Sequence, residues 1–269
     1  MNMMSKVKEK RPAWHAENMT IETGHATAVG HVRTKQEDRY LDAAPVIAVA
    51  DGMGGLDRGD YAAETMIAAL EDCTFGGTTA EARSAIKAAI TKADTKLAKV
   101  RAKKNGGESG TTIVGAVLGR GTARDCWLIF HVGDSRLYTF EDGSLQQLTC
   151  DHSLVQELME TGMLTEAQAR IDPRRSIVTR AIGTAVSSQP DFRLVEARGQ
   201  LLIACSDGIS DELDDEDIAW IISENADKDP SEIATALVDA ALEMGGHDNA
   251  TVVVARAIPA SMDPTRGKD

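Results

Sequence analysis

The sequence predicts an α+β fold in which antiparallel sheets are covered by helices. The expected strands and helices come in blocks and do not alternate strictly along the chain, which is typical of antiparallel sheets. A meander of short strands between residues 111 and 149 indicates the same class. With 269 residues, 42% of them hydrophobic, the chain can bury one substantial core. We therefore expect a single domain.

Charge and cysteine usage narrow the class of protein. The formal net charge is −13, so the chain lacks the basic surface that binds nucleic acid phosphates or anionic lipid. Residues 1–11 are polar and basic without a following apolar core, and no run approaches the ~20 apolar residues of a membrane helix. The four cysteines are far apart and form no Cys-x-x-Cys pair, which favours core thiols. We expect a cytoplasmic protein that binds neither nucleic acid nor membrane.

The first part of the chain begins with a polar segment and ends with two amphipathic helices. The continuous apolar run at residues 46–50 predicts a buried strand, and apolar residues at helical spacing predict the helices. The expected elements are, in order, a mobile tail (1–18), a strand (26–32), a polar turn (33–40), a strand (46–50) and two helices (59–73 and 79–103).

The second part of the chain opens with the meander, and the expected domain extends over residues 19–258 with a tail at 259–269. Residues 153–176 are expected to form a flap-like insertion, and insertions of this kind often lie over a site. The expected elements are four strands (111–118, 126–132, 136–140, 145–149), two short helical stretches (153–162, 165–170), an irregular segment (172–175), two strands (192–196, 201–204), two helices (214–225, 230–244) and a last strand (250–257).

Four aspartates, each at a strand edge or a turn, are the candidate functional residues. Asp51 follows the buried strand and precedes glycines, and Asp38, Asp207 and Asp248 occupy similar positions. Any one of them is most simply a helix cap or a turn residue. Gathered together, they would repel one another and raise each other's pKa, which implies bound cations. Ligand sets made only of oxygen suit Mg²⁺ or Mn²⁺ and not zinc.

Eight short motifs in a characteristic order resemble the metal-dependent protein phosphatases of the PP2C or PPM family, in their compact bacterial form. The similarity runs from residue 26 to residue 254. It implies a four-layer αββα sandwich, with two antiparallel sheets flanked by helices on each outer face. The motifs are Gly30-His31-Val32-Arg33 with Glu37-Asp38, Asp51-Gly52-Met53-Gly54-Gly55, Ser109-Gly110-Thr111-Thr112, Gly133-Asp134-Ser135-Arg136, Asp151-His152-Ser153, Thr179-Arg180-Ala181-Ile182-Gly183, Ser206-Asp207-Gly208 and Asp248-Asn249-Ala250-Thr251.

The resemblance also implies a dimetal centre. Asp51 would bridge two Mn²⁺ or Mg²⁺ ions, helped by Asp38 and the carbonyl group of Gly52 on one side and by Asp207 and Asp248 on the other. Hydroxide held between two such cations is a nucleophile near neutral pH, so the phosphate monoester would be hydrolysed directly.

Two further residues near the first motif receive roles from the resemblance. Glu37 would act through metal-bound water. Arg33 matches the phosphate-binding arginine of the family, for which a planar guanidinium that forks two phosphate oxygens is well suited. The alternative for Arg33 is a surface ion pair with Glu37 or Asp38.

The motifs say less about the ligands of a weaker third cation and about which group gives a proton to the leaving group. Asp134 matches an acid that binds a third ion together with Asp207 in some relatives, and Asp211 is expected to orient water there. Met53 stands where animal relatives have a histidine proposed as general acid, so a metal-bound water is our first candidate for that role. His152 is the second candidate, although a structural turn histidine explains it better.

The sequence therefore predicts a protein-serine/threonine phosphatase that acts as a monomer on phosphorylated proteins and opposes a Ser/Thr kinase. Two alternatives remain open. One is a catalytically silent binding module of the same fold, which the complete set of acids argues against. The other is a phosphatase of a small phosphorylated metabolite.

The flap-like insertion is expected to choose substrates without performing chemistry. Arg174 and Arg175 lie in it, in a chain of strongly negative net charge, and are candidate ligands for the acidic flank of a phosphopeptide. The equally weighted alternative is that these arginines pair with neighbouring acids such as Glu166 and Asp172.

Overall fold

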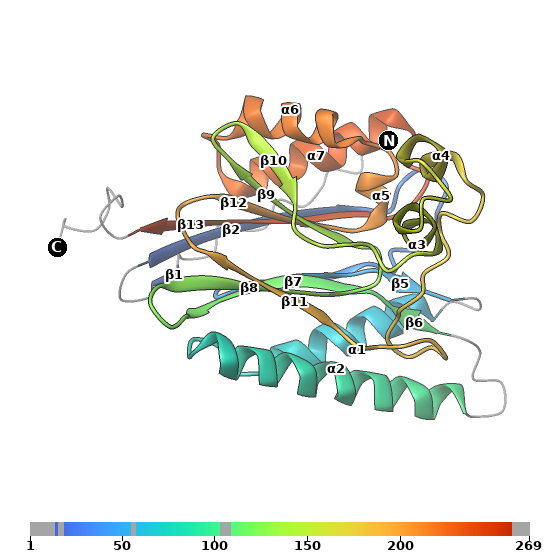
Figure 1. Ribbon diagram of the computed structural model, residues 1–269, viewed down its shortest axis with the longest axis horizontal. Helices are drawn as coiled ribbons and strands as arrows, with labels where there is room; N and C mark the ends of the chain where they lie inside the picture. The colour runs from blue at the N-terminus through green and yellow to red at the C-terminus, as the bar shows by residue number, and fades with distance from the viewer. Residues whose placement is uncertain (1–13, 16–18, 55–57, 103–108, 260–269) are drawn as a thin grey trace.

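Two antiparallel sheets pack face to face and carry helices on both outer faces (Figure 1). The computed structural model describes residues 14–15, 19–54, 58–102 and 109–259. From one outer face to the other the layers are a helix pair, a sheet, a second sheet and a second helix pair. The predicted four-layer αββα sandwich is confirmed.

The first sheet contains the chain's last long strand beside one of its first. Its strand order is β1-β2-β13-β12-β9-β10, and every described pairing in it is antiparallel. The strands are β1 (Trp14–His15), β2 (Met19–Ala28), β13 (Ala250–Pro259), β12 (Leu201–Cys205), β9 (Arg136–Glu141) and β10 (Ser144–Gln147).

The second sheet has the order β11-β8-β7-β4-β3, again antiparallel throughout its described pairings. A short two-stranded ladder of β5 and β6 lies at one end of it. The strands are β11 (Asp191–Glu196), β8 (Asp125–Val132), β7 (Ile113–Arg120), β4 (Val46–Ala50), β3 (Arg39–Ala43), β5 (Gly52–Met53) and β6 (Gly110–Thr111).

Strand β4 shows why its sequence is continuously apolar. Successive side chains of a strand point to opposite faces. Val46 and Ala48 face the outer helices, whereas Ile47 and Val49 face the other sheet, where they join Trp127 in the central core. Because both faces of β4 are buried, every position on it must be apolar.

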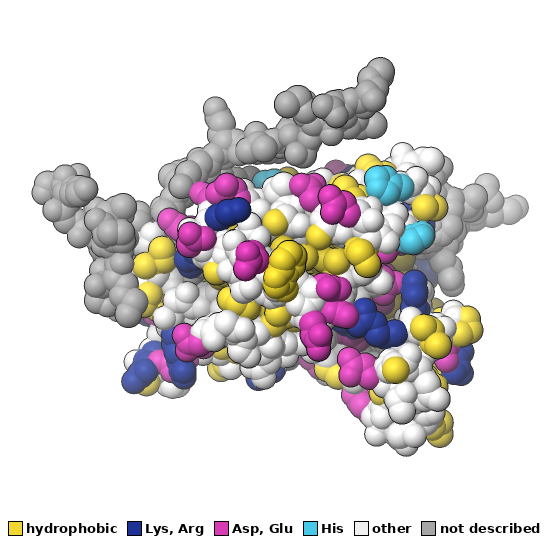
Figure 2. Space-filling view, turned by 90° about the horizontal axis from the view of Figure 1, so that it is seen from above, with side chains coloured by type: hydrophobic (Ala, Val, Ile, Leu, Met, Phe, Trp, Pro, Cys, Tyr) yellow, Lys and Arg dark blue, Asp and Glu magenta, His cyan; other side chains and the backbone are white. Residues whose placement is uncertain are grey.

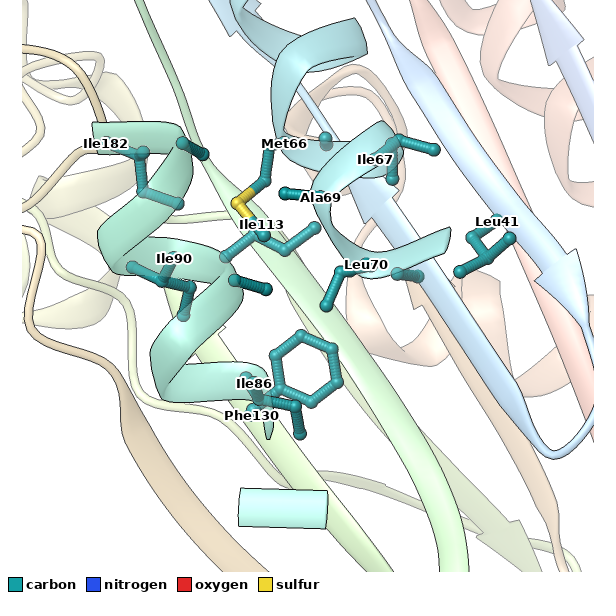
Figure 3. Packing of buried hydrophobic residues seen from close by; sticks show 14 of the residues in the cluster. Leu41, Met66, Ile67, Ala69, Leu70, Ile86, Ile90, Ile113, Phe130 and Ile182 are labelled. Carbon is teal, nitrogen blue, oxygen red and sulfur yellow. The ribbon is translucent and has the colours of Figure 1, made fainter. Parts of the chain in front are cut away.

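Helices α1 (Gly59–Glu71) and α2 (Thr79–Arg101) cover the second sheet. Leu70 of α1 and Ile86 of α2 lie beside Phe130 of β8, and Met66 of α1 lies towards Ile113 of β7 (Figure 3). All five side chains are fully buried. A capping box formed by Thr78 and Glu81 starts α2. Helices α6 (Asp215–Asn225) and α7 (Pro230–Met244) cover the first sheet in the same way.

Three shorter helices gather at one end of the sandwich, near the β5–β6 ladder (Figure 1). They are α3 (Leu154–Glu160), α4 (Glu166–Ile171) and α5 (Asp207–Ser210). The first two belong to the flap, which we define as residues 153–176. Among the described residues, no helix is long and apolar enough to cross a membrane.

The expected boundaries are wrong near the N-terminus. The strand predicted over residues 26–32 is β2, which begins at Met19 and ends at Ala28. It cannot continue because Gly30 has a φ of 82°, a left-handed conformation that ends an extended run. The polar segment 33–40 was expected to be a turn, yet its last two residues begin β3.

The tail boundaries also differ from the expectation. Trp14–His15 lies within the expected N-terminal tail but pairs with β2 as an edge strand. At the other end, β13 extends to Pro259, the first residue of the expected C-terminal tail. The remainder of both expected tails lies outside the described residues.

We expect truncation of Leu237 to destabilise the protein strongly, because its side chain is fully buried between α7 and the first sheet. Leu237→Ala should lower the free energy of unfolding by about 2–5 kcal/mol. Leu194→Ala is the matched control, since Leu194 is 58% exposed, and it should cost less than about 1 kcal/mol. Urea unfolding followed by circular dichroism measures both, and equal losses would contradict the packing described here.

Candidate metal centre

The four aspartates singled out in the sequence lie at the same end of the two sheets. Asp38 and Asp51 stand one residue beyond the paired ends of β3 and β4, where Arg39 lies opposite Ala50. Asp207 follows β12 and Asp248 precedes β13, strands that pair with each other in the first sheet. Antiparallel pairing within each sheet and stacking of the sheets therefore bring the four carboxylates together.

The carboxyl groups of Asp38, Asp51 and Asp207 are in direct contact. Asp51 lies close enough to Asp38 and Asp207 for their charges to raise its pKa, and the hydroxyl of Ser206 donates to Oδ2 of Asp38 at 2.8 Å. The Oδ1 atoms of Asp38 and Asp207 are buried and have no hydrogen-bond partner within the described part of the chain. Buried carboxylate oxygens without a partner are costly, and a cation is the partner that best suits them.

Burial and mutual repulsion raise the pKa values of Asp38, Asp51, Asp134 and Asp207. For Asp51 and Asp207 the pKa lies well above its usual range, first because the carboxyl groups are buried and then because neighbouring aspartates repel the charge. Burial raises the pKa of Asp38 to about 6. It raises that of Asp134 to about 7, with Asp151 and Asp211 adding to the effect. Divalent cations would reverse these shifts, so the donor set fits hard metal ions.

The backbone of Asp51 is held from the neighbouring strands. Its N–H donates to Oγ1 of Thr112 at 3.0 Å, and its carbonyl oxygen accepts from Oγ1 of Thr111 and from N–H of Thr112, both at 2.9 Å. Oγ1 of Thr112 in turn lies 2.7 Å from Oγ of Ser135. We predicted no role for these hydroxyls from the sequence, although they belong to two of the motifs.

Gly52 and Gly59 allow the loop after β4 to press against the start of α1. A Cβ atom on Gly52 would lie 2.2 Å from the carbonyl oxygen of Gly59, and one on Gly59 would lie 2.5 Å from that of Gly52. A Cβ on Gly59 would also lie 2.9 Å from Oε1 of Glu37. Close backbone approach therefore requires glycine at both positions and brings the Glu37 side chain beside the loop.

Arg33 pairs with an acid of the cluster. Nη2 of Arg33 donates to Oδ2 of Asp248 at 2.5 Å, and this contact is the main reason why the pKa of Arg33 is raised. The alternative expected from the sequence was an ion pair with Glu37 or Asp38, so the partner observed is a different acid. The arginine side chain is 52% exposed, which leaves it accessible to a ligand.

Asn249 joins the segment that carries Arg33 and Asp38 to the segment that carries Asp248. Its Oδ1 accepts from N–H of Glu37 at 2.7 Å, and its Nδ2 donates to the carbonyl oxygens of Val29 and Lys35 at 2.9 and 3.0 Å. We predicted no role for Asn249 beyond its place in a motif. An asparagine beside a motif aspartate is a weak signal, because the three backbone groups it satisfies are more than 210 residues away in sequence.

The flap arginines are engaged by acids. Arg174 forms a forked pair with Asp172, with Nε to Oδ1 at 2.9 Å and Nη2 to Oδ2 at 2.8 Å. Arg175 reaches Asp211, with 3.2 Å between Nη2 and Oδ2. Glu166 pairs with neither arginine within the residues that the structure describes. The pairing alternative is thus observed for Arg174, whereas Arg175 connects the flap to the acid expected near a third cation.

A second group of residues that could bind a metal, two histidines and an aspartate, is held together by hydrogen bonds. Ligand atoms of His131, His152 and Asp191 lie within 4.8 Å of one another. The two rings stack, with centroids 4.4 Å apart and planes at 15°, so their in-plane lone pairs do not converge. His131 donates from Nε2 to the carbonyl oxygen of Cys150, and His152 accepts from N–H of Gly133 and donates to Asp191. Because both ring nitrogens of His152 are used, its role is structural.

Comparison with known proteins agrees with this geometry. The model of the family described as protein phosphatase 2C matches residues 17–250. Serine/threonine protein phosphatase PstP of Mycobacterium tuberculosis is 37% identical over 236 residues, covering 85% of this chain and 43% of that protein. Serine/threonine phosphatase stp of Listeria welshimeri is 32% identical over 238 residues, covering 84% of this chain and 91% of that one.

A solved structure extends the likeness to the fold. The catalytic domain of the serine/threonine protein phosphatase PstP, in complex with two manganese ions, is 31% identical with a TM-score of 0.74. The alignment covers 89% of this chain and 99% of that one. Since the chain spans less than half the length of the mycobacterial PstP relative, the likeness concerns that protein's matching part.

We expect Mn²⁺ to stabilise the protein more at pH 7.5 than at pH 5.5. Asp38 and Asp134 have pKa values of about 6 and about 7, above that of an ordinary aspartate, so the metal-free fold keeps these protons longer than the unfolded chain does. Their contribution to stability is present at low pH and is lost as the pH rises through these values. At pH 5.5 protons compete with the cation. The rise in Tm on adding Mn²⁺ should therefore be larger by about 5 °C at pH 7.5.

Thermal unfolding in EDTA and in Mn²⁺ at both pH values measures this difference. Na⁺ at matched ionic strength controls for screening of surface charge. An equal rise in Tm at the two pH values would show that the aspartates do not release protons when Mn²⁺ binds.

Proposed function

The chain belongs to the protein phosphatase 2C family, and from that premise we propose that it hydrolyses phosphoserine and phosphothreonine in proteins with the help of divalent cations. The observation that carries the proposal is the contact among the buried carboxyl groups of Asp38, Asp51 and Asp207, two of which keep an oxygen without a partner in the described chain. Such a cluster is unfavourable unless cations neutralise it.

We assign Asp38, Asp51, Asp207, Asp248 and the Gly52 carbonyl as the groups that would hold two Mn²⁺ or Mg²⁺ ions, with Asp51 shared between them. Bound there, the cations would make hydroxide available near neutral pH and neutralise charge on the phosphoryl oxygens. The protein's own part is to hold the carboxylates in place. Hydrogen bonds to the backbone of Asp51 and to Oδ2 of Asp38 provide this rigidity.

Arg33 is the residue that we assign to the phosphate dianion. It stands beside the cluster, in contact with Asp248 and within the field of Asp207 and Asp51. A guanidinium presents five N–H donors in a fork that matches phosphate oxygens, and only one terminal nitrogen contacts Asp248. Arg33 therefore orients the substrate. The carboxylate of Glu37 lies beside Gly59, and we assign it to act through water in the site.

The finer parts of the proposal concern ions and partners. A weaker third cation is assigned to Asp134 and Asp207, with Asp211 nearby to orient its waters. The acids around Asp134 support this, because burial and repulsion hold its carboxyl group partly protonated near neutral pH. The physiological substrate would be a phosphoprotein made by a Ser/Thr kinase, and the protein would act as a cytoplasmic monomer.

We expect hydrolysis of p-nitrophenyl phosphate and of a phosphothreonine peptide to require Mn²⁺ or Mg²⁺ and to stop in EDTA. Asp51→Asn should lower kcat at least about 100-fold, since even residues that only support metal ligands contribute 10- to 100-fold. It should also weaken Mn²⁺ binding measured by calorimetry. Asp72→Asn, which alters an exposed ion pair with Lys92, is the matched control and should leave both values unchanged. Full activity in excess EDTA would refute the metal-dependent reaction.

Arg33→Ala should raise KM for a phosphopeptide about ten-fold or more with a smaller change in kcat, because a charged hydrogen bond to the dianion is lost in ground state and transition state alike. Arg124→Ala removes a more exposed arginine that pairs with Glu196 away from the cluster, and it serves as the control. A fall in kcat at constant KM would show instead that Arg33 acts only in the transition state.

A further inference from the structure

A cavity of about 440 Å³ lies between the flap and α5. Its lining includes Asp134 and Asp207, so it is continuous with the candidate metal centre. Residues of α3 and α4 form part of the opposite side. A phosphorylated side chain that reaches the metal centre would therefore have this cavity beside it, within reach of the neighbouring residues of the same peptide.

Part of the lining is apolar. Val155 and Met159 of α3, Ala169 of α4 and Leu213 after α5 contribute to it. Val155, Ala169 and Leu213 are buried, so these positions form a fixed surface. Methionine is unbranched and adapts its shape to a ligand. The cavity can thus accept the aliphatic part of a long side chain.

Two of the three arginines in the lining are neutralised by acids in the lining. Arg136 forks onto Asp151, with Nε and Nη2 at 2.9 and 2.7 Å from Oδ2. Arg175 pairs with Asp211 at 3.2 Å. Each pair cancels one positive and one negative formal charge. They leave Arg170 as the remaining guanidinium of the cavity.

Three acids of the lining outnumber that remaining arginine. Glu160 accepts only from neutral donors, Nε2 of Gln156 at 3.2 Å and Sγ of Cys150 at 3.4 Å. Asp215 accepts from the hydroxyl of Tyr138 at 3.2 Å. Glu160, Glu166 and Asp215 form no ion pair within the described ranges of the chain. Even with the metal ligands neutralised by cations, the cavity keeps an excess of negative charge.

We propose that this cavity is a subsite for a lysine or arginine side chain of the phosphopeptide. The aliphatic stem would lie on Val155 and Met159, and the cationic head would meet Glu160 and Glu166 of the flap. The inference rests on the proposed phosphatase activity and assigns it a substrate class, phosphopeptides with a basic flank. An acidic flank, which the flap arginines suggested from the sequence alone, is disfavoured because Arg174 and Arg175 are already paired.

The charge pattern of the surface agrees with this assignment. Seen from above, acidic side chains are spread across the whole visible face, whereas basic groups gather in a few places (Figure 2). Since the net charge is −13, the field around the protein attracts basic peptides over acidic ones. The cavity then selects among them at short range.

The test uses phosphothreonine peptides that differ only in having Arg, Ala or Glu at the positions flanking the phosphothreonine. The readout is the ratio of kcat/KM for the Arg and Ala peptides on the same enzyme with Mn²⁺, so effects on the shared chemistry cancel. We expect a preference of about three- to ten-fold for Arg in the unmodified protein at low salt, decreasing as salt screens the charges. Glu peptides should be the poorest substrates.

Variants locate the preference. Glu160→Gln combined with Glu166→Gln should bring the Arg to Ala ratio close to one, and Glu166→Lys should turn the preference towards the Glu peptide. Glu157→Gln is the matched control, because Glu157 is an exposed glutamate of α3 that does not line the cavity, and it should keep the ratio of the unmodified protein.

Equal kcat/KM for the three peptides, or a preference for Glu, would overturn the inference and leave the proposed function intact. An Arg preference that persists in the double variant would also overturn it, because the selective charge would then lie elsewhere. If no phosphopeptide is hydrolysed although p-nitrophenyl phosphate is, the proposed function fails and the inference fails with it.

Discussion

Repulsion among buried carboxylates is the constraint on which the structure depends. Two stacked sheets bring Asp38, Asp51 and Asp207 into contact at one end, where burial and like charge raise their pKa values. A protein that gathered these groups without cations would lose stability on ionising them. The two stacked sheets therefore act as a rigid frame that holds oxygen ligands close together for metal ions. The fold thereby supplies the ligands that metal-dependent phosphate chemistry requires.

The frame resists that repulsion through backbone hydrogen bonds that reach the outer helices. Thr111 holds the carbonyl of Asp51 and exchanges two backbone hydrogen bonds with Ile182, at 2.9 and 3.0 Å. The next residue, Gly183, donates its N–H to Oδ1 of Asp94 on α2 at 2.8 Å. Helix α2 thus supports the metal centre although none of its residues belongs to it. Ligands held by rigid elements keep their geometry better than ligands on unsupported loops.

The flap has a different physical character from the frame. Its buried side chains are few, among them Val155 and Ala169, and an ion pair between Arg175 and Asp211 joins it to the body. Exposed ion pairs contribute little stability and weaken with salt. Arg174 and Arg175, which suggested a positive surface in the sequence, each form an ion pair with an aspartate in the structure. The glutamates of the flap therefore carry the remaining charge. The substrate selection that we propose for the flap and the metal binding that we propose for the frame would therefore be able to change independently.

The sequence by itself determined the sheet-and-helix class, most elements from residue 46 onward and the identity of the acids, because apolar periodicity and the order of the motifs are local properties of the chain. It misplaced the start of β2 at Met19, because the apolar and polar residues alternate only over Met19–Glu22 before Thr23 and Gly24 interrupt the pattern. Only the tertiary structure decided which groups pair: Arg33 with Asp248, Arg175 with Asp211, and Asn249 with backbone groups far away in the chain. Such partners lie on different strands and loops, so their distances follow from how the two sheets stack, which no local pattern encodes.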